Sequence, residues 1–151
     1  MRHAAFSLLL AGALLTLSAA HPGMASAQTV EVFKSASCGC CTLWMRHLIR
    51  SGFSTKGKDL DGKELAQFKV DARVPSKLQS CHTARVGGYV IEGHVPAADI
   101  RRLLAERPDA IGLAVPGMPI GSPGMESGNE REPYDVLLIR RDGSTQVFSS
   151  H

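Results

Sequence analysis

Near the start of the chain, the pattern of hydrophobic and polar positions predicts a buried strand followed by an amphipathic helix. The apolar run of strand length consists of Val30, Val32 and Phe33. Between residues 40 and 50, apolar side chains recur at i, i+3, i+4 and i+7, at Cys41, Trp44, Met45 and Leu48. This spacing places them on one helix face, so we expect Trp44 and Met45 in the core and a helix end at Ser51-Gly52.

The segments that follow predict a second strand, a short helix, a hairpin and a third helix. We expect these elements at residues 53–58, 59–68, 82–86 with 89–94, and from Pro96 to Pro108. Gly87-Gly88 suits the hairpin turn, because glycine tolerates the positive φ angles of a two-residue turn. Proline fits the first turn of a helix and also stops one, which sets both ends of the third helix.

This order of elements predicts an α/β fold of the thioredoxin-like type. A parallel βαβ unit is followed by an antiparallel hairpin and a covering helix. Residues 112–133 depart from the pattern as a long Gly/Pro/Met loop, with Pro-Gly-Met at 116–118 and again at 123–125. A loop of this length inside a compact domain is typically functional or disordered. Residues 134–139 and 145–148 predict a C-terminal hairpin.

Residues 1–27 predict a signal peptide, and residues 28–151 a single domain. The stretch starts with a basic Arg2, continues as an apolar run and ends at Ala25-Ser26-Ala27, a pattern typical of a cleavage site. An uncleaved anchor helix is the alternative, but the run is short for a membrane span. We therefore expect a secreted chain, beginning near Gln28, without stable membrane insertion.

The charge balance gives little support to a polyanionic partner. Of 17 basic residues only Arg2 lies in the leader, and none of the 14 acidic residues does, so the remaining chain carries +2. It contains no basic run. Nucleic acid is therefore not an expected partner.

The cysteines carry the main chemical signal. Cys38 and Cys41 form a C-x-x-C pair between a predicted strand and helix, where free N–H groups and the helix dipole favour thiolate. A dithiol oxidoreductase needs only two sulfurs, so Cys40 between them favours a metal site. In a thioredoxin-like fold, the loop before the hairpin contains a cis-proline and abuts the start of the C-x-x-C helix. Cys81 follows Pro75 at the matching place in this chain. We expect the four sulfurs to converge.

Charge and softness favour copper(I) over zinc at such a site. One zinc ion held by four thiolates leaves a charge of −2, which is costly to bury. Four copper(I) ions bridged by four thiolates are neutral, and soft thiolates select Cu(I). Adjacent Cys40 and Cys41 diverge around the helix, so they chelate one ion poorly but can bridge neighbouring ions. The structural alternative is a pair of disulfides, Cys38–Cys41 and Cys40–Cys81, in an oxidising compartment.

Further donors accompany the cysteines. The hairpin turn pairs residues whose numbers sum to 175, which sets His94 opposite Cys81 as a ligand or as a neighbour of a ligand. Met118 and Met125 are soft thioethers in matching contexts, and they either bind copper or pin the loop. His82 is a weaker ligand candidate, because its strand face also carries Ala84, Val86 and Ile91 and is typical of the core. His47 is expected to be solvated, and Glu92 and Asp99 lack a partner for acid–base catalysis.

Four segments together resemble a known family. They are residues 34–44 with Cys38-Gly-Cys-Cys, 74–83 with Ser80-Cys81-His82-Thr83, 88–96 with Gly93-His94, and 116–125 with both Pro-Gly-Met units. They are similar to the small periplasmic metal-binding proteins of the CopG copper-resistance type, formerly a domain of unknown function. The resemblance implies a thioredoxin-like fold, a periplasmic location, a role in copper tolerance and a cysteine-bridged multinuclear copper site on Cys38, Cys40, Cys41 and Cys81. It also implies interconversion of Cu(I) and Cu(II).

Three hypotheses follow from the sequence. The first is a periplasmic protein that holds Cu(I) as a thiolate cluster and works with other copper-handling proteins. The second is a thiol–disulfide oxidoreductase using Cys38 and Cys41. The third is a disulfide-stapled module that binds a partner through residues 112–133. Cys40 favours the first over the second, and the methionines of the loop favour the first over the third.

Overall fold

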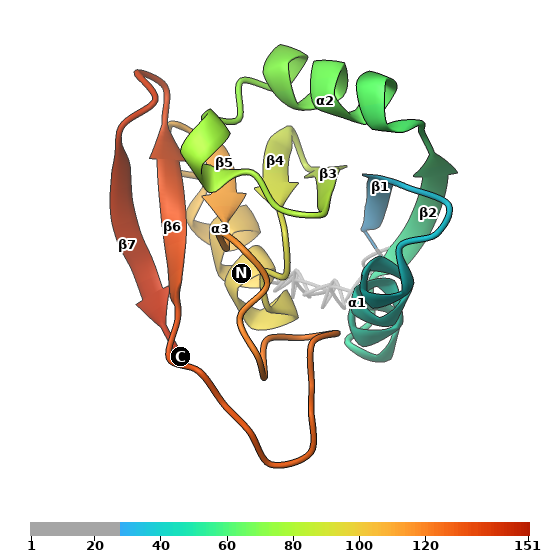
Figure 1. Ribbon diagram of the computed structural model, residues 1–151. Coiled ribbons are helices and arrows are strands. Elements are labelled where there is room, and N and C mark those ends of the chain that lie inside the picture. Colours follow the sequence, from blue (N-terminus) through green and yellow to red (C-terminus); the bar gives the residue numbers. More distant parts are fainter. Residues whose placement is uncertain (1–27) are drawn as a thin grey trace, which may run out of the picture.

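A computed structural model describes residues 28–151, which form a mixed α/β structure; the expected signal peptide lies outside the described residues. Its elements in chain order are β1 (Thr29–Lys34), α1 (Gly39–Arg50), β2 (Ser54–Asp59), α2 (Gly62–Asp71), a 3-10 turn (Ser76–Leu78), β3 (His82–Val86), β4 (Tyr89–Glu92), α3 (Ala97–Glu106), β5 (Ala110–Ala114), β6 (Asp135–Arg140) and β7 (Thr145–Ser150) (Figure 1). None of the described helices is long and apolar enough to cross a membrane.

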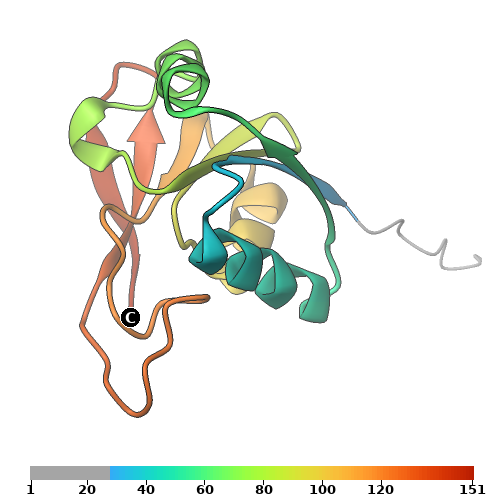
Figure 2. The same cartoon turned by 45° about the vertical axis from the view of Figure 1, so that its right-hand side comes forward.

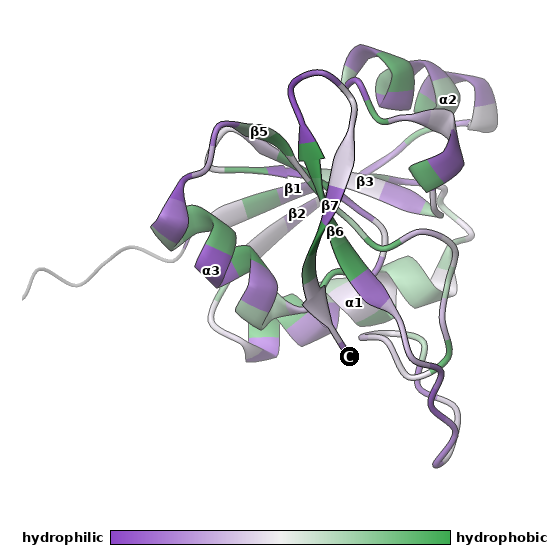
Figure 3. Cartoon of the chain, turned by 90° about the vertical axis from the view of Figure 1, so that its left-hand side faces the viewer, coloured by the Kyte–Doolittle hydropathy of each residue, from purple (hydrophilic) through white to green (hydrophobic). Residues whose placement is uncertain are grey.

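The strands build one seven-stranded sheet in the order β2-β1-β3-β4-β5-β6-β7. β1 pairs with β2 in parallel and with β3 antiparallel, and β3 and β4 form a hairpin. The α/β class and the predicted order of the first seven elements are confirmed. The thioredoxin-like assignment, which depends on this order, stays a prediction. Helices α1 and α3 lie on one face of the sheet and α2 on the other (Figures 1, 2 and 3).

The main core lies under α1 and α3. Trp44 and Leu48 from α1, with Ile100 and Leu103 from α3, are fully buried against apolar side chains of the sheet. The Trp44 Nε1–H donates to the Val95 carbonyl at 2.9 Å, which satisfies the polar atom of this large buried side chain. Met45 packs against the same cluster while partly buried. The core roles predicted for the helix face are confirmed.

The structure corrects the sequence pattern at one strand and one helix boundary. β5 occupies Ala110–Ala114, so the long loop begins at residue 115 and not at 112. Its small residues give a weak strand signal, yet Gly112 is required because a Cβ there would collide with the backbone of Val90 on β4. α2 begins at Gly62, because the Asp61 side chain accepts from the Glu64 N–H at 2.8 Å and caps the helix.

A buried ion pair connects α2 to the sheet. Lys69 Nζ donates to Glu92 Oε1 at 2.6 Å, and the Thr83 hydroxyl donates to Glu92 Oε2 at 2.6 Å. Glu92 Oε1 also accepts the Ser80 N–H at 2.6 Å. Glu92 is fully buried. The carboxylate therefore fixes the backbone of the residue that precedes Cys81. The partners of Glu92 are thus structural.

Asp99 also has partners in the folded chain. Its carboxylate accepts from the Ser149 hydroxyl at 2.8 Å and lies 2.8 Å from His151 Nε2. The acid thereby ties the start of α3 to the C-terminal strand.

All described peptide bonds are trans, so the cis-proline expected ahead of Cys81 is absent from the described residues.

We predict that Glu92→Gln destabilises the fold by about 3–5 kcal/mol, since it leaves the Lys69 ammonium buried without a counter-charge. The glutamine amide oxygen can still accept the Ser80 N–H, so the loss of stability measures the effect of removing the carboxylate charge. Denaturant unfolding measures the change. The matched double variant Lys69→Met with Glu92→Gln removes both charges, and it should recover most of the loss. Equal stability of the single and double variants would contradict this account of the pair.

Candidate metal centre

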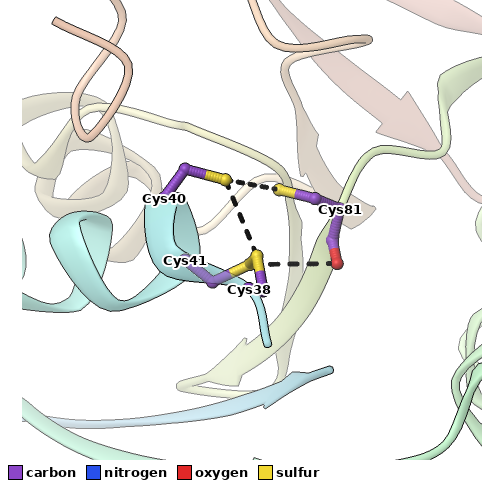
Figure 4. Close-up of side chains that lie close together, drawn as sticks. All are labelled: Cys38, Cys40, Cys41 and Cys81. Carbon is purple, nitrogen blue, oxygen red and sulfur yellow. Dashed lines mark hydrogen bonds between the residues drawn. A yellow bond between two sulfur atoms is a disulfide. The ribbon is translucent and has the colours of Figure 1, made fainter. Parts of the chain in front are cut away.

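The four cysteines meet at the first turn of α1. Cys38 is the N-cap residue, Cys40 and Cys41 lie in the first turn, and Cys81 stands just before β3. The Sγ atoms of Cys38 and Cys40 are 3.6 Å apart, and those of Cys40 and Cys81 are 3.9 Å apart (Figure 4). All four sulfurs lie within 4.8 Å of one another, close enough to hold metal. The predicted convergence is confirmed.

The backbone at the helix start favours negatively charged sulfur. Small residues 35–37 form a turn in which the Cys38 N–H donates to the Ser35 carbonyl at 3.0 Å. Cys38 makes no side-chain cap, and the first turn of α1 contains no acidic residue. The unpaired N–H groups and the positive end of the helix dipole therefore remain available to stabilise thiolates.

Two of the sulfurs are joined covalently. Cys38 and Cys41 form a disulfide, whereas Cys40 and Cys81 are free thiols. One bond of the two-disulfide alternative is therefore present, and the other is not. A four-thiolate site consequently requires reduction of the Cys38–Cys41 bond.

His94 lies beside Cys81, as the hairpin register predicts. β3 and β4 pair Thr83 with Glu92, and continuing this register sets Cys81 opposite His94. His94 Nε2 lies 3.1 Å from Cys81 Sγ, and its Nδ1 lies 2.8 Å from the Pro123 carbonyl. A carbonyl can only accept, so Nδ1 carries the proton and Nε2 presents its lone pair to the sulfur. The His94 side chain is fully buried.

His82 is both a core residue and a neighbour of the sulfur. Its ring is fully buried and packs on Trp44, with 4.4 Å between ring centroids. Its Nδ1 also lies 3.3 Å from Cys81 Sγ. Strand alternation predicts the buried face correctly but not this contact, because Cys81 lies ahead of β3 and does not follow its alternation. Cys81, His82 and His94 form a second group of donor atoms within 4.8 Å of one another.

Burial sets the protonation of this group. It lowers the pKa of His82 well below 6.5, and it also lowers the pKa of His94, so both rings are neutral near pH 7. Burial, with the neighbouring Cys40, raises the pKa of Cys81 to about 12. Cys81 is therefore a thiol in the absence of metal, and a metal ion must displace its proton.

The long loop folds over the centre through both Pro-Gly-Met units. The Ser80 hydroxyl donates to the Gly117 carbonyl, and His94 contacts the Pro123 carbonyl. Gly124 lies so close to α1 that a Cβ would stand 2.9 Å from the Cys40 carbonyl oxygen and 2.7 Å from the Trp44 nitrogen. The residues next to both methionines are thus held at the site. Met118 is half exposed and Met125 partly buried, and their role as ligands stays a prediction.

His47 is not solvated, contrary to the expectation from its place on the helix. It is half-buried, and its Nε2 accepts the Ala97 N–H at 3.1 Å. The ring therefore caps the start of α3 from α1. Sequence spacing could not reveal this contact, because it joins two helices 50 residues apart in the chain.

Comparison with known proteins agrees with this arrangement. Residues 78–125, which include Cys81, His94 and the loop, match the family described as "Protein of unknown function, DUF411". Two solved structures named "Copper resistance protein copG", forms 1 and 2, are 41% identical to this chain with a TM-score of 0.77. The match covers 82% and 83% of this chain, and 96% and 98% of those chains. No curated protein sequence matches.

The chain belongs to the CopG copper-resistance family. The DUF411 match to this CopG-family chain begins at residue 78, so it does not include Cys38, Cys40 or Cys41. The resemblance drawn from the sequence motifs is confirmed, and metal binding at the cysteine cluster fits it.

We predict that Gly124→Ala loosens the loop of this CopG-family protein more than Gly117→Ala does. Both glycines have positive φ, of 88° and 69°, so alanine at either position costs about 1–2 kcal/mol in backbone conformation. Only at position 124 would the added Cβ meet α1. Alkylation of Cys40 should be faster in Gly124→Ala, while Gly117→Ala keeps the rate of the unsubstituted protein. Equal alkylation rates in the two variants would show that the loop does not cover Cys40.

We also predict that the metal-free protein loses stability as the pH falls below 6.5. The folded pKa values of His82 and His94 lie below 6.5, whereas unfolded histidine takes up its proton there. The stabilisation is therefore complete above pH 6.5 and declines below it, by up to about 2 kcal/mol for the two histidines by about pH 5.5. Urea unfolding at several pH values measures this change.

The variant His82→Leu is the control for this pH dependence. It removes one buried neutral ring and should make the decline smaller, while His94 and His47, whose pKa values are also lowered, remain. Burial raises the pKa of Glu92, which acts in the opposite direction at lower pH, so the comparison stays above pH 5.5. A free energy of unfolding that is constant from about pH 7.5 to 5.5 would mean that the histidines are not held neutral.

Proposed function

We propose that this protein is a periplasmic copper-binding protein that contributes to copper resistance by holding Cu(I) in a cysteine-bridged, multinuclear site. The observation that carries the proposal is the convergence of four cysteine sulfurs within 4.8 Å of one another. Soft thiolates select Cu(I), and the related solved structures are named as a copper resistance protein.

Charge balance supports several monovalent ions over one divalent ion. Four thiolates with one zinc ion leave a charge of −2, whereas four Cu(I) ions leave none. Cys40 and Cys41 are adjacent at the start of α1, which suits bridging between neighbouring ions better than chelation of one ion. Copper is here the bound cargo, with Cys38, Cys40, Cys41 and Cys81 as its ligands.

Donors outside the four cysteines would complete the site. His94 Nε2 faces Cys81 Sγ, and the backbone beside Met118 and Met125 is held at the centre. We propose these three residues as additional copper ligands. The loop that carries the methionines would also restrict access of water and of oxidants to the bound copper.

We propose a location, a domain organisation and partners as well. The leader pattern in residues 1–27 supports export, with residues 28–151 as one metal-binding domain in the periplasm. Other periplasmic copper-handling proteins would deliver and remove the metal. Interconversion of Cu(I) and Cu(II) is the redox role that the family resemblance implies.

A second candidate function is thiol–disulfide exchange by Cys38 and Cys41. The observation in its favour is the disulfide between these residues at the start of α1, with Cys38 partly exposed. Against it, Cys40 Sγ lies 3.6 Å from Cys38 Sγ, where a third thiol would compete with the resolving cysteine. Catalysed reduction of insulin by the copper-free protein would favour this function.

The test of the first proposal is a Cu(I) titration of the reduced chain, residues 28–151, under argon. We expect more than one copper ion per chain and thiolate-to-copper absorption, because four thiolates can bridge several ions. Cys40→Ser should reduce the stoichiometry to one ion or fewer. The matched control Ser37→Ala alters the same loop without removing a sulfur, and it should bind like the unsubstituted chain. A single ion in the unsubstituted chain, or none, would refute the cluster.

A further inference from the structure

The disulfide between Cys38 and Cys41 leaves a second set of donor atoms centred on Cys81. Around Cys81 Sγ lie His94 Nε2 at 3.1 Å, His82 Nδ1 at 3.3 Å and Cys40 Sγ at 3.9 Å. This set mixes sulfur and nitrogen, unlike the four-sulfur cluster. Cys40 and Cys81 are the free thiols of the described chain, so the set is intact while the other two cysteines are bonded to each other.

His94 is oriented as a metal ligand. Its Nδ1–H donates to the Pro123 carbonyl at 2.8 Å, which fixes the tautomer with the Nε2 lone pair toward Cys81. Metal-binding histidines are commonly held by a hydrogen bond of this kind from the other ring nitrogen to a backbone carbonyl. The Pro-Gly-Met loop therefore supports the nitrogen donor as well as covering the sulfurs.

His82 occupies a place where an apolar side chain would otherwise be favoured. The ring is fully buried, and Nε2 has no hydrogen-bond partner within residues 28–151. The other ring nitrogen, Nδ1, contacts Cys81 Sγ. A buried imidazole with an unpaired nitrogen is unfavourable. The property that distinguishes histidine from an apolar residue at position 82 is therefore the donor atom directed at Cys81.

The charge of the remaining donors matches a divalent ion. Two thiolates and two neutral imidazoles carry −2, and one divalent ion makes the site neutral. Two cysteines and two histidines are also a common ligand set of tetrahedral zinc. The objection to zinc at the four-thiolate cluster, its excess negative charge, disappears once two of the sulfurs are spent on the disulfide.

We propose that Cys40, Cys81, His82 and His94 bind one divalent ion of the zinc class while Cys38 and Cys41 are joined by their disulfide. The oxidation state of the C-x-x-C pair then selects the metal: several Cu(I) ions bind in the reduced state and one divalent ion binds in the oxidised state. This function lies beyond the proposed copper cluster. It shares only ligands with that cluster and does not require copper to bind.

The test begins with the chain of residues 28–151 in its disulfide state, verified by mass spectrometry. Trypsin separates residues 35–46, which hold Cys38, Cys40 and Cys41, from residues 78–85, which hold Cys81, so a bond within the first peptide is distinguished from a cross-link. Zn²⁺ alone is then titrated in competition with a chromophoric chelator. We expect one Zn²⁺ per chain.

Variants identify the ligands. His82→Leu and His94→Leu should each weaken Zn²⁺ binding by at least about 100-fold, since loss of even an outer neighbour of a metal ligand costs about 10–100-fold. The double variant Cys38→Ser with Cys41→Ser should still bind one Zn²⁺, because the site does not use those sulfurs. His151→Gln, at a histidine near the C-terminal strand, is the matched control and should bind like the unsubstituted chain.

Co²⁺ supplies a readout that needs no variant. In the oxidised chain we expect thiolate-to-cobalt charge transfer and the d–d bands of a tetrahedral ion. The spectrum of octahedral cobalt, absence of Zn²⁺ binding, binding that survives both histidine variants, or its loss in the Cys38/Cys41 variant would each overturn the inference. Failure of Cu(I) to bind the reduced chain would refute the copper proposal alone, because the two tests use different metals and oxidation states.

Discussion

The placement of Cys81 against the start of α1 is the constraint on which the whole metal centre depends. Three cysteines are adjacent in the chain, but a fourth sulfur reaches them only because β3 lies beside β1, whose end leads into α1. Glu92 then holds the Ser80 N–H, and the Ser80 hydroxyl holds the loop at Gly117. The buried Lys69–Glu92 ion pair lies on one face of the sheet. Through Ser80, it fixes the position of the Cys81 sulfur at the end of the sheet.

In our proposals, charge links the choice of metal to the oxidation state of the cysteines. Four thiolates at the end of a helix dipole favour several monovalent copper ions, and removal of two by a disulfide leaves a balance for one divalent ion. The two histidines add no charge to the centre, because burial keeps the rings of His82 and His94 neutral. In the two proposals, the oxidation state of Cys38 and Cys41 is therefore coupled to the charge of the bound cation through electrostatics.

Much of this arrangement could be predicted from the sequence, for reasons that particular residues make clear. The helical spacing of Trp44 and Leu48 and the Gly87-Gly88 turn are local signals, and the turn also fixes the register that brings His94 to Cys81. Long-range contacts between unlike elements leave no such signal. The cap of α3 by His47, the Lys69–Glu92 pair and the contact of His82 with Cys81 depend on how separate elements pack.

The central claim is that copper in this protein is bound by sulfur and lies close to further copper. X-ray absorption at the copper edge of the reduced, Cu(I)-loaded chain measures both properties at once. The account predicts a first shell dominated by sulfur together with scattering from neighbouring copper ions. A first shell of nitrogen and oxygen, or a sulfur shell with no copper neighbour, would contradict it.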